Sequence, residues 1–464
     1  MIKEKIVLNI NKNKDSLTII AKKIWENPEL FLEEFYASNL QKEYLKSHGF
    51  KIIEYENLPT AFMAEYGKEG PILGLLGEYD ALKNLSQEAS SHRNPLQENG
   101  AGHGCGHNLL GVGCIGAALA IKEQIEKGEI KGIIRYYGCP AEEVLIGKAL
   151  MAKQGAFHDL DACLTWHPSS FTMPWAGSLL SMISAKFSFE GKSSHAGSAP
   201  HMGRSALSAV ELMNTGTNYM REHIDEQSRI HYIITKGGIE PNTVPAQAEV
   251  WYNIRAPKRE IADEIFQWLN DIAKGAALMT QTKISKVELV SGCYEVLTNQ
   301  TLVKLIEQNM NTLGGPEYGD DARVFAKEIS EKFTRSEKIK GLESNFIPLS
   351  FIDQYLHEKT SSPLDFDKYF KASTDVGDVS WITPTAMFGV ATWPLGTAAH
   401  TWQTTAASGS SIGFSAMIFA SKVMATTLVD LYQNEGLLNI VKDEFNKNTS
   451  GHVYNSIFDK KIEL

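Results

Sequence analysis

A long stretch without charge is the feature that most limits the folds open to this chain. From Val379 to Ser421 there is no Asp, Glu, Lys or Arg, and the one histidine is His400. Such a stretch belongs in a membrane, in a buried core or in a site. Pro384, Pro394 and Gly396 interrupt the windows of about 20 apolar residues that a spanning helix needs. We therefore expect the stretch to be buried inside protein.

Composition favours a soluble protein of several domains. With 464 residues the chain exceeds one ordinary core and predicts two or three domains. Its 45 Lys and Arg against 55 Asp and Glu give a net charge of −10, which argues against a nucleic-acid partner. The five cysteines lack the dense spacing of a disulfide framework. No signal peptide is recognisable at the N-terminus, so a cytoplasmic protein without a membrane span is expected.

Short apolar runs alternate with helical patterns through the first part of the chain. Two helices are expected in the first 50 residues, at Asp15–Trp25 and Leu32–His48. The strands expected after them are Ala61–Glu65, Ile72–Leu76, Ile133–Tyr137 and Ala162–Trp166, and the helices are Asn108–Gln124 and Ile146–Gln154. Nearly continuous apolar strands that alternate with helices predict an α/β layer with a mostly parallel sheet.

From about Leu180 the pattern changes to alternating strands. The expected elements are a strand at Met182–Glu190, a helix at Arg204–Glu222, strands at Arg229–Thr235 and Ala246–Arg255, a helix at Arg259–Leu278 and a strand at Lys283–Val290. This β-α-β-β-α-β order is that of a ferredoxin-like domain. The predicted domains are therefore 1–180 and 292–464, forming one α/β domain, with 181–291 inserted between them.

The last part of the chain returns to α/β character. The charged segment Tyr318–Tyr369 is expected to pack outside the sheet as helices and loops. Within the uncharged stretch, Thr404–Gly413 is expected to form a tight turn before a buried final helix at Phe414–Leu431.

A glycine-rich cluster with soft ligands precedes the apolar helix. It reads Gly102-His103-Gly104-Cys105-Gly106-His107-Asn108. Cysteine and neutral histidine are ligands that zinc-like metals prefer, and the glycines allow a close approach of the backbone. A glycine-rich turn with an ordinary buried cysteine explains the cluster equally well when it is taken alone.

Further candidate ligands follow predicted strands. Glu142 and Glu143 come after one strand, where open α/β sheets place their ligands, although a helix start also favours Glu. His167 closes another strand, and His400 lies in the uncharged stretch; each alone is more often structural. Asp80, also at a strand end, can accept the second N–H of a metal-bound imidazole. Together these features indicate a metal site.

These motifs resemble the M20 family of metallopeptidases and amidohydrolases, in its branch with a Cys-Gly-His motif. The segments that carry the resemblance are Asn27–Leu30, Gly77–Leu82, Gly104–Asn108, Pro140–Glu143, Ser194–Gly197, Gly238–Asn242, Ser373–Trp381 and His400–Gln403. The resemblance covers nearly the whole chain. It implies a zinc-peptidase-like catalytic domain with an inserted lid and dimerisation domain.

The resemblance also implies roles for individual residues. It implies a two-metal centre with the ligands Cys105, His107, Glu143, His167 and His400. Glu142 matches the general base, and Asp80 matches the carboxylate that orients a ligand. On the lid, His195 resembles a residue that stabilises the oxyanion in the partner subunit's site, and Asn242 resembles a substrate contact. Asn108 departs from the usual Asp after His107, so a local change of hydrogen bonding is expected there.

The implied activity is hydrolysis of an amide bond in an N-acyl amino acid. An aroyl-glutamate, similar to p-aminobenzoyl-glutamate, is the leading substrate; a dipeptidase, a partner subunit that needs a second subunit, and a purely structural metal are the alternatives. Arg204 and Arg255 are candidates to bind a substrate carboxylate. Zinc or manganese is expected, with cobalt or nickel as alternatives. The lid is expected to form a homodimer or heterodimer, and Asp375 and Asp378 are left without an assigned role.

Overall fold

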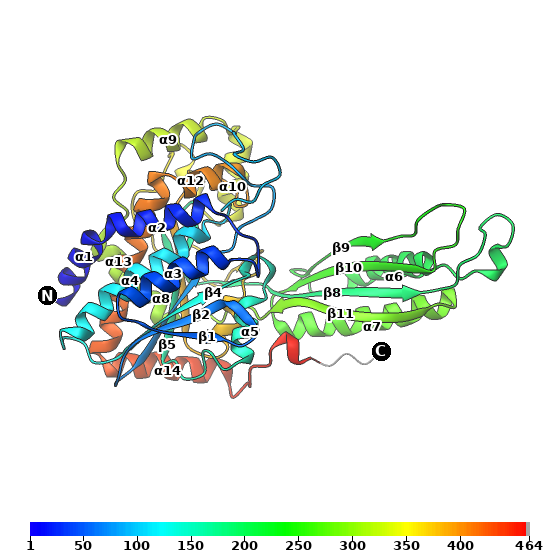
Figure 1. The fold of residues 1–464 in the computed structure, drawn as a ribbon, viewed down its shortest axis with the longest axis horizontal. Helices are drawn as coiled ribbons and strands as arrows, with labels where there is room; N and C mark the ends of the chain where they lie inside the picture. Colours follow the sequence, from blue (N-terminus) through cyan, green and yellow to red (C-terminus); the bar gives the residue numbers. More distant parts are fainter. Residues whose placement is uncertain (461–464) are drawn as a thin grey trace. The chain divides into compact units, whose positions relative to one another are not determined.

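The chain forms two compact units in a computed structural model that describes residues 1–460 (Figure 1). The large unit comprises Met1–Ser178, Leu297–Phe370 and Val379–Val453. The small unit comprises Leu179–Val296, Lys371–Asp378 and the described residues from Tyr454 onward. Both units are therefore built from more than one segment of the chain.

A seven-stranded sheet forms the middle of the large unit, in the order β1-β2-β4-β3-β5-β13-β6. Its strands are β1 (Lys51–Tyr55), β2 (Leu58–Gly67), β3 (Ile72–Glu78), β4 (Ile133–Cys139), β5 (Ala162–Ser169), β6 (Met173–Trp175) and β13 (Thr385–Ala391). The four middle strands β4, β3, β5 and β13 run parallel, and the outer strands pair antiparallel. The predicted α/β class with a mainly parallel sheet is confirmed.

Two apolar helices bury this sheet. Helices α4 (His107–Glu126) and α13 (Ser411–Gln433) pack against each other, and both contact sheet strands. Nearly every side chain of α4 between His107 and Ile121 is buried, which explains why the helix is apolar on all sides. Among the described residues, α13 is the one helix long and apolar enough to cross a membrane, and 89% of its most apolar window is buried in the core.

The other helices of the large unit surround this core. They are α1 (Ile2–Lys12), α2 (Lys14–Glu26), α3 (Phe35–Ser47), α5 (Gly147–Lys153), α8 (Gln300–Leu313), α9 (Asp320–Ser330), α10 (Arg335–Ser344), α12 (Trp402–Ser408) and α14 (Glu435–Thr449). Three further short elements are β7 (Ser178–Leu179), β12 (Tyr369–Phe370) and α11 (Val376–Ser380).

Three local predictions are wrong. The first 50 residues hold three helices and not two, because α1 precedes the first predicted helix and buries Ile6 and Ile10, which lie one turn apart. The expected turn Thr404–Gly413 is mostly helical, because α12 continues to Ser408 and α13 begins at Ser411; the side chain of Thr401 caps the first turn of α12. Helix α13 is not the final helix, because α14 follows it.

The small unit is a four-stranded antiparallel sheet covered by two helices. Its elements are β8 (Ser181–Glu190), α6 (Ala206–Met220), β9 (Arg229–Lys236), β10 (Gln247–Ala256), α7 (Arg259–Thr280) and β11 (Lys283–Cys293), with the sheet order β11-β8-β10-β9. Both helices pack on the sheet and on each other (Figure 1). The predicted β-α-β-β-α-β order is confirmed.

Candidate metal centre

The carboxyl ends of the parallel strands bring the candidate ligands to one edge of the sheet. Strand β3 ends at Glu78, β4 is followed by Glu142 and Glu143, and β5 carries His167 near its end. Strand β13 is followed by the loop that contains His400. Because β3, β4, β5 and β13 run parallel, residues that follow them meet at the same edge.

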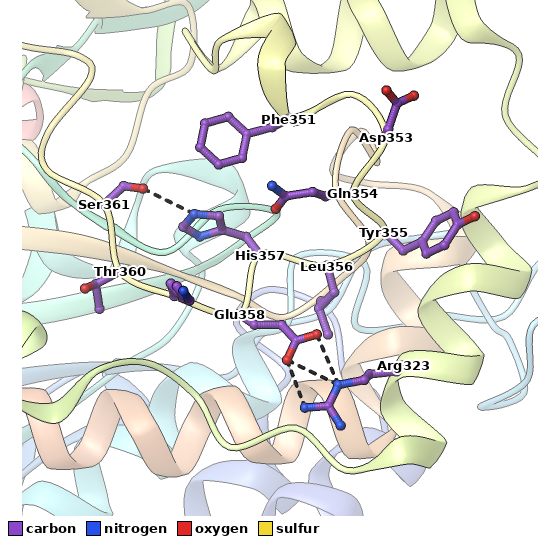
Figure 2. A pocket seen from close by; sticks show the side chains of 11 residues that line it. Arg323, Phe351, Asp353, Gln354, Tyr355, Leu356, His357, Glu358, Thr360 and Ser361 are labelled. Carbon is purple, nitrogen blue, oxygen red and sulfur yellow. Dashed lines mark hydrogen bonds and ion pairs between the residues drawn. The ribbon is translucent and has the colours of Figure 1, made fainter.

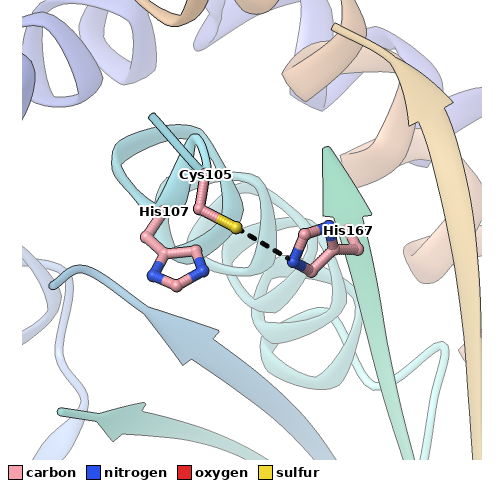
Figure 3. Close-up of side chains that lie close together, drawn as sticks. All are labelled: Cys105, His107 and His167. Atoms are coloured by element: carbon pink, nitrogen blue, oxygen red, sulfur yellow. Dashed lines mark hydrogen bonds between the residues drawn. The ribbon is translucent and has the colours of Figure 1, made fainter. Parts of the chain in front are cut away.

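Two groups of potential ligand atoms share one sulfur. Cys105, His107 and His167 form one group, and Cys105, Glu143 and His400 form the other; within each group the ligand atoms lie within 4.8 Å of one another. In Figure 3 both His107 and His167 lie beside Cys105, whose Sγ is 3.6 Å from His167 Nε2. The five predicted ligands therefore lie together, in an arrangement suited to two ions that share Cys105.

Backbone geometry holds the cysteine turn closely against the rest of the site. Gly106 has φ +75°, and a Cβ there would lie 2.9 Å from the ring of Pro168. The amide N–H of His400 donates to the carbonyl of Gly104 at 3.2 Å. Residues 102–106 thus need glycine where the loops approach each other, which accounts for the glycine-rich motif.

Asp80 orients two of the candidate ligands. Its Oδ1 lies 2.9 Å from His107 Nδ1, and its Oδ2 accepts the backbone N–H of Glu143 at 2.9 Å. Burial would raise the pKa of Asp80, but the hydrogen bond from His107 lowers it below its usual value. An ionised Asp80 accepts a hydrogen bond from His107 Nδ1–H, which leaves Nε2 as the ligand atom of His107.

Several buried polar atoms at this edge have no hydrogen-bond partner among the described residues. They include His107 Nε2, Glu143 Oε1 and Glu78 Oε2. Unsatisfied buried acceptors are costly, and a bound cation satisfies them. The residues therefore fit the divalent metal ions that the sequence predicts.

Burial sets the protonation of the remaining ligands. It lowers the pKa of His167 to about 4, so the imidazole is neutral and ready to bind a metal. It raises the pKa of Glu143 to about 8, and burial also raises the pKa of the Cys105 thiol. A metal ion must displace these protons, and His400, whose side chain is half exposed, lies where the centre meets solvent.

The predicted general base lies beside these atoms. Glu142 is buried, and its Oε2 is 3.8 Å from His107 Nε2. Ala141 before it and Leu145 after it both adopt left-handed backbone conformations, with φ +56° and +58°. Such strain in non-glycine residues is typical of functional turns.

The small unit carries the other predicted residues, and they are described within that unit alone. His195 and Asn242 are exposed and adjacent, since Ala196 N–H donates to the Asn242 carbonyl at 2.8 Å. Arg204 donates to the side chain of Gln281 and to two backbone carbonyls. Arg255 donates to Ser373 at 2.8 Å.

Three residues near the motifs have structural contacts. Asn108 donates to the carbonyls of Ala21 and Ser408, so it joins helices and does not face the ligands. His103 Nε2 faces the carbonyl of Ile24, away from the metal centre. Asp378 accepts a hydrogen bond from Tyr454 at 2.7 Å in the small unit.

Two residues of the site were missed in the sequence. Glu78 Oε2 lies 3.3 Å from His107 Nε2, and Glu78 Oε1 pairs with Lys148 at 2.6 Å. The position of Glu78 at a strand end, two residues before Asp80, was a usable signal. Lys148 carried none, because a single lysine near a helix start normally faces solvent.

Comparisons with known proteins give a consistent identification. Residues 178–279 match the model of the M20 peptidase dimerisation domain. The chain is 39% identical over 98% of its length to one subunit of p-aminobenzoyl-glutamate hydrolase from Escherichia coli, covering 96% of that protein. It is 27% identical to the mouse Xaa-Arg dipeptidase, over 96% of this chain and 92% of that one.

A solved structure shares the fold at low sequence identity. A dinuclear metal-binding peptidase of the M20 family from Bacillus subtilis superposes with a TM-score of 0.56. The alignment covers 90% of this chain and 99% of the other, with 16% identity. This similarity supports the fold of both units.

Proposed function

Because the chain belongs to the M20 family of metallopeptidases and amidohydrolases, we propose that it hydrolyses the amide bond of an N-acyl amino acid at a two-metal centre. The observation that carries this proposal is the pair of ligand groups that share Cys105. Cys105, His107, Glu143, His167 and His400 would hold two divalent ions, with zinc or manganese as the leading candidates. Bound ions of this kind polarise a carbonyl and acidify water.

The residues of the chain supply the remaining chemistry. Glu142 takes a proton from the attacking water and delivers it to the leaving amine. Asp80 keeps His107 and Glu143 oriented through its two oxygens. His195 is proposed to donate to the developing oxyanion in a dimer formed through the small unit, as the family resemblance implies.

An aromatic wall supports an aromatic acyl group. Trp175 lies beside His167, with ring centroids 5.7 Å apart, and Phe370 follows at 5.7 Å from Trp175. Phe346 extends the row at 5.1 Å from Phe370. These three side chains are only partly buried, and partly exposed aromatic faces beside a metal ligand suit stacking with an aroyl ring. A p-aminobenzoyl-glutamate-like substrate is therefore proposed.

Two relatives keep alternative functions open to test. The Xaa-Arg dipeptidase is similar over nearly the whole chain, which supports a dipeptide substrate as the second candidate. The name of the Escherichia coli relative describes one subunit of a hydrolase, which supports a partner subunit in place of a homodimer. Arg204, Arg255 and Asn242 are retained as proposed substrate contacts.

The test is hydrolysis of a panel by metal-loaded protein. The panel holds p-aminobenzoyl-glutamate, aliphatic N-acyl amino acids and Xaa-Arg dipeptides, with and without a second subunit. Glu142→Gln is expected to lower kcat by roughly 10²- to 10⁴-fold while metal content stays unchanged. Equal turnover by wild type and Glu142→Gln would refute the role of Glu142. A preference for the dipeptides would favour the dipeptidase activity.

A further inference from the structure

A fully buried ion pair lies at the carboxyl edge of the sheet. Glu78 ends β3, Lys148 lies in the first turn of α5, and their side chains are 1% and 0% exposed. Lys148 Nζ and Glu78 Oε1 are 2.6 Å apart. Burying two charges is expensive, so a pair in this position calls for an explanation beyond stability.

Only one oxygen of Glu78 is used by the lysine. The other, Oε2, is buried, has no hydrogen-bond partner among the described residues and lies 3.3 Å from His107 Nε2. That nitrogen is likewise without a hydrogen-bond partner in the described part of the chain. Because Nδ1 of the same ring faces Asp80, a neutral His107 presents a lone pair to Glu78, and two acceptors then face each other. A proton or a metal ion between them removes this repulsion.

Glu142 lies close to Glu78 and His107, so three potential ligand residues are grouped here. Ligand atoms of Glu78, His107 and Glu142 all lie within 4.8 Å of one another, and all three residues are buried. Carboxylate oxygen and imidazole nitrogen are both ordinary ligands of zinc and manganese. A metal ion bound between Glu78 and His107 would therefore lie beside Glu142, the proposed general base. The group shares His107 with the ligand set already described, so it enlarges that set.

Charge around the centre is consistent with this position. The acidic groups near this edge include Cys105, Glu78, Asp80, Glu142 and Glu143, and Lys148 is a buried cation paired with Glu78.

We propose that Glu78 Oε2 is a further ligand of the metal ion held by His107, and that Lys148 keeps Glu78 monodentate by occupying Oε1. The inference rests on the metal centre of the proposed function. It adds a sixth protein ligand to that centre and gives the buried lysine a positioning role. Replacing Lys148 frees Oε1, so Glu78 can then bind the ion through both oxygens.

The experiment measures metal binding directly and does not depend on turnover. Wild type, Glu78→Gln and Lys148→Met are stripped with a chelator and titrated with Zn²⁺ in competition with an indicator. Each is also loaded with Co²⁺, whose visible spectrum reports coordination. We expect Glu78→Gln to weaken one of the two ions by about 10- to 100-fold and Lys148→Met to change the Co²⁺ spectrum.

The matched control is Glu65→Gln, which breaks the ion pair of Glu65 with Arg135 elsewhere in the same sheet. It is expected to leave both Zn²⁺ affinities and the Co²⁺ spectrum unchanged. Should Glu78→Gln fail to fold, a structure of Zn²⁺-loaded wild type decides the matter. A Glu78 oxygen at about 2.0–2.2 Å from the ion supports the proposal.

The failures of the two proposals are distinguishable. Wild type that binds two ions and hydrolyses amides, with Glu78→Gln matching it in affinity and spectrum, overturns the role of Glu78 alone. A Glu78 oxygen well outside the coordination distance of about 2.0–2.2 Å from both ions does the same. Wild type that binds no metal overturns the proposed function together with this inference.

Discussion

Two buried histidines of the large unit differ in whether their hydrogen bonds are complete. In the metal centre, His107 is fully buried and its Nε2 has no hydrogen-bond partner among the described residues. His357 is also buried, yet its Nδ1 accepts the Thr172 N–H at 3.1 Å and its Nε2 lies 3.2 Å from Ser361 Oγ. Its ring stacks on Phe171, with centroids 3.6 Å apart.

The cavity beside His357 is likewise lined by polar side chains that already have hydrogen-bond or ion-pair partners. This cavity of about 680 Å³ is lined by Arg323, Phe351 and residues 353–361. Figure 2 shows the side chains that line it. Arg323 pairs with Glu358 at 2.9 Å, and the polar atoms of His357 are already used. Concavity alone therefore does not distinguish the candidate metal centre, where unsatisfied buried atoms of His107, Glu143 and Glu78 lie together.

Removing Cys105 Sγ, which both ligand groups share, is expected to have the largest effect on the candidate metal centre. Cys105→Ala is expected to lose both metal ions and to lower kcat/KM by roughly 10⁴-fold or more, because both ligand groups contain Cys105. Metal content by plasma mass spectrometry and turnover of the best substrate measure the two effects. Cys163→Ala, another buried thiol of the sheet, is the control, and retention of one ion by Cys105→Ala would contradict the sharing.

His195 differs from both of these histidines, because it is exposed and only its Nδ1 accepts hydrogen bonds. Its Nδ1 accepts the N–H groups of Gly197 and Ser198, which leaves Nε2 available to a ligand. If Nε2 donates to the oxyanion, His195→Ala should lower kcat by roughly 10²- to 10³-fold with unchanged metal content. His201→Ala, an exposed neighbour, should behave as wild type, and equal kcat values for all three proteins would exclude the donor role.

A milder change tests the orientation of the ligands. Asp80→Asn keeps the shape of the side chain but removes the charge that faces His107 Nδ1. We expect Zn²⁺ affinity to fall by about 10- to 100-fold, as measured by competition with an indicator. Asp161→Asn, whose carboxylate accepts the Ile72 N–H in the same sheet, provides the control, and unaltered affinity in Asp80→Asn would argue for a purely structural Asp80.

His357 should have little effect on turnover and a measurable effect on stability. Burial lowers its pKa to about 4 from 6.5, so the unfolded chain takes up a proton first as the pH falls. Its contribution to stability is therefore present above pH 6.5 and is lost as the pH falls toward 4, by about 2 kcal/mol between pH 7 and pH 5.

Urea unfolding at the two pH values checks this contribution. The loss of stability should be about 2 kcal/mol larger in wild type than in His357→Gln, while kcat differs by less than about twofold. Equal losses in the two proteins would show that the protonation of His357 is not linked to folding.

Much of this structure is predictable from local pattern. The parallel strands are apolar runs that end in polar residues. Because ligands gather at the carboxyl ends of such strands, the sequence alone predicts that His167 and Glu143 lie close together. The role of Glu142 rests on motif resemblance and that of Asp80 also on its place at a strand end, and both remain predictions.

What the sequence did not reveal depends on tertiary contacts. Helix α1 owes its stability to burial of Ile6 and Ile10 against a core formed much later in the chain. The pairing of Glu78 with Lys148 joins residues from two separate elements, and no spacing rule connects them. Likewise, His357 differs from His107 through partners such as Thr172 that lie far away in sequence.

The insertion of the small unit separates the proposed metal ligands in the order of synthesis as well as in sequence. Cys105, His107, Glu143 and His167 leave the ribosome before the small unit, whereas His400 and strand β13 come after it. At ordinary translation speeds, the interval between His167 and His400 lasts on the order of ten to fifty seconds. During that interval the nascent chain holds a thiol and imidazoles without their last partner. If the proposed ligands hold metal, the complete ligand set exists only after the small unit and strand β13 have been synthesised.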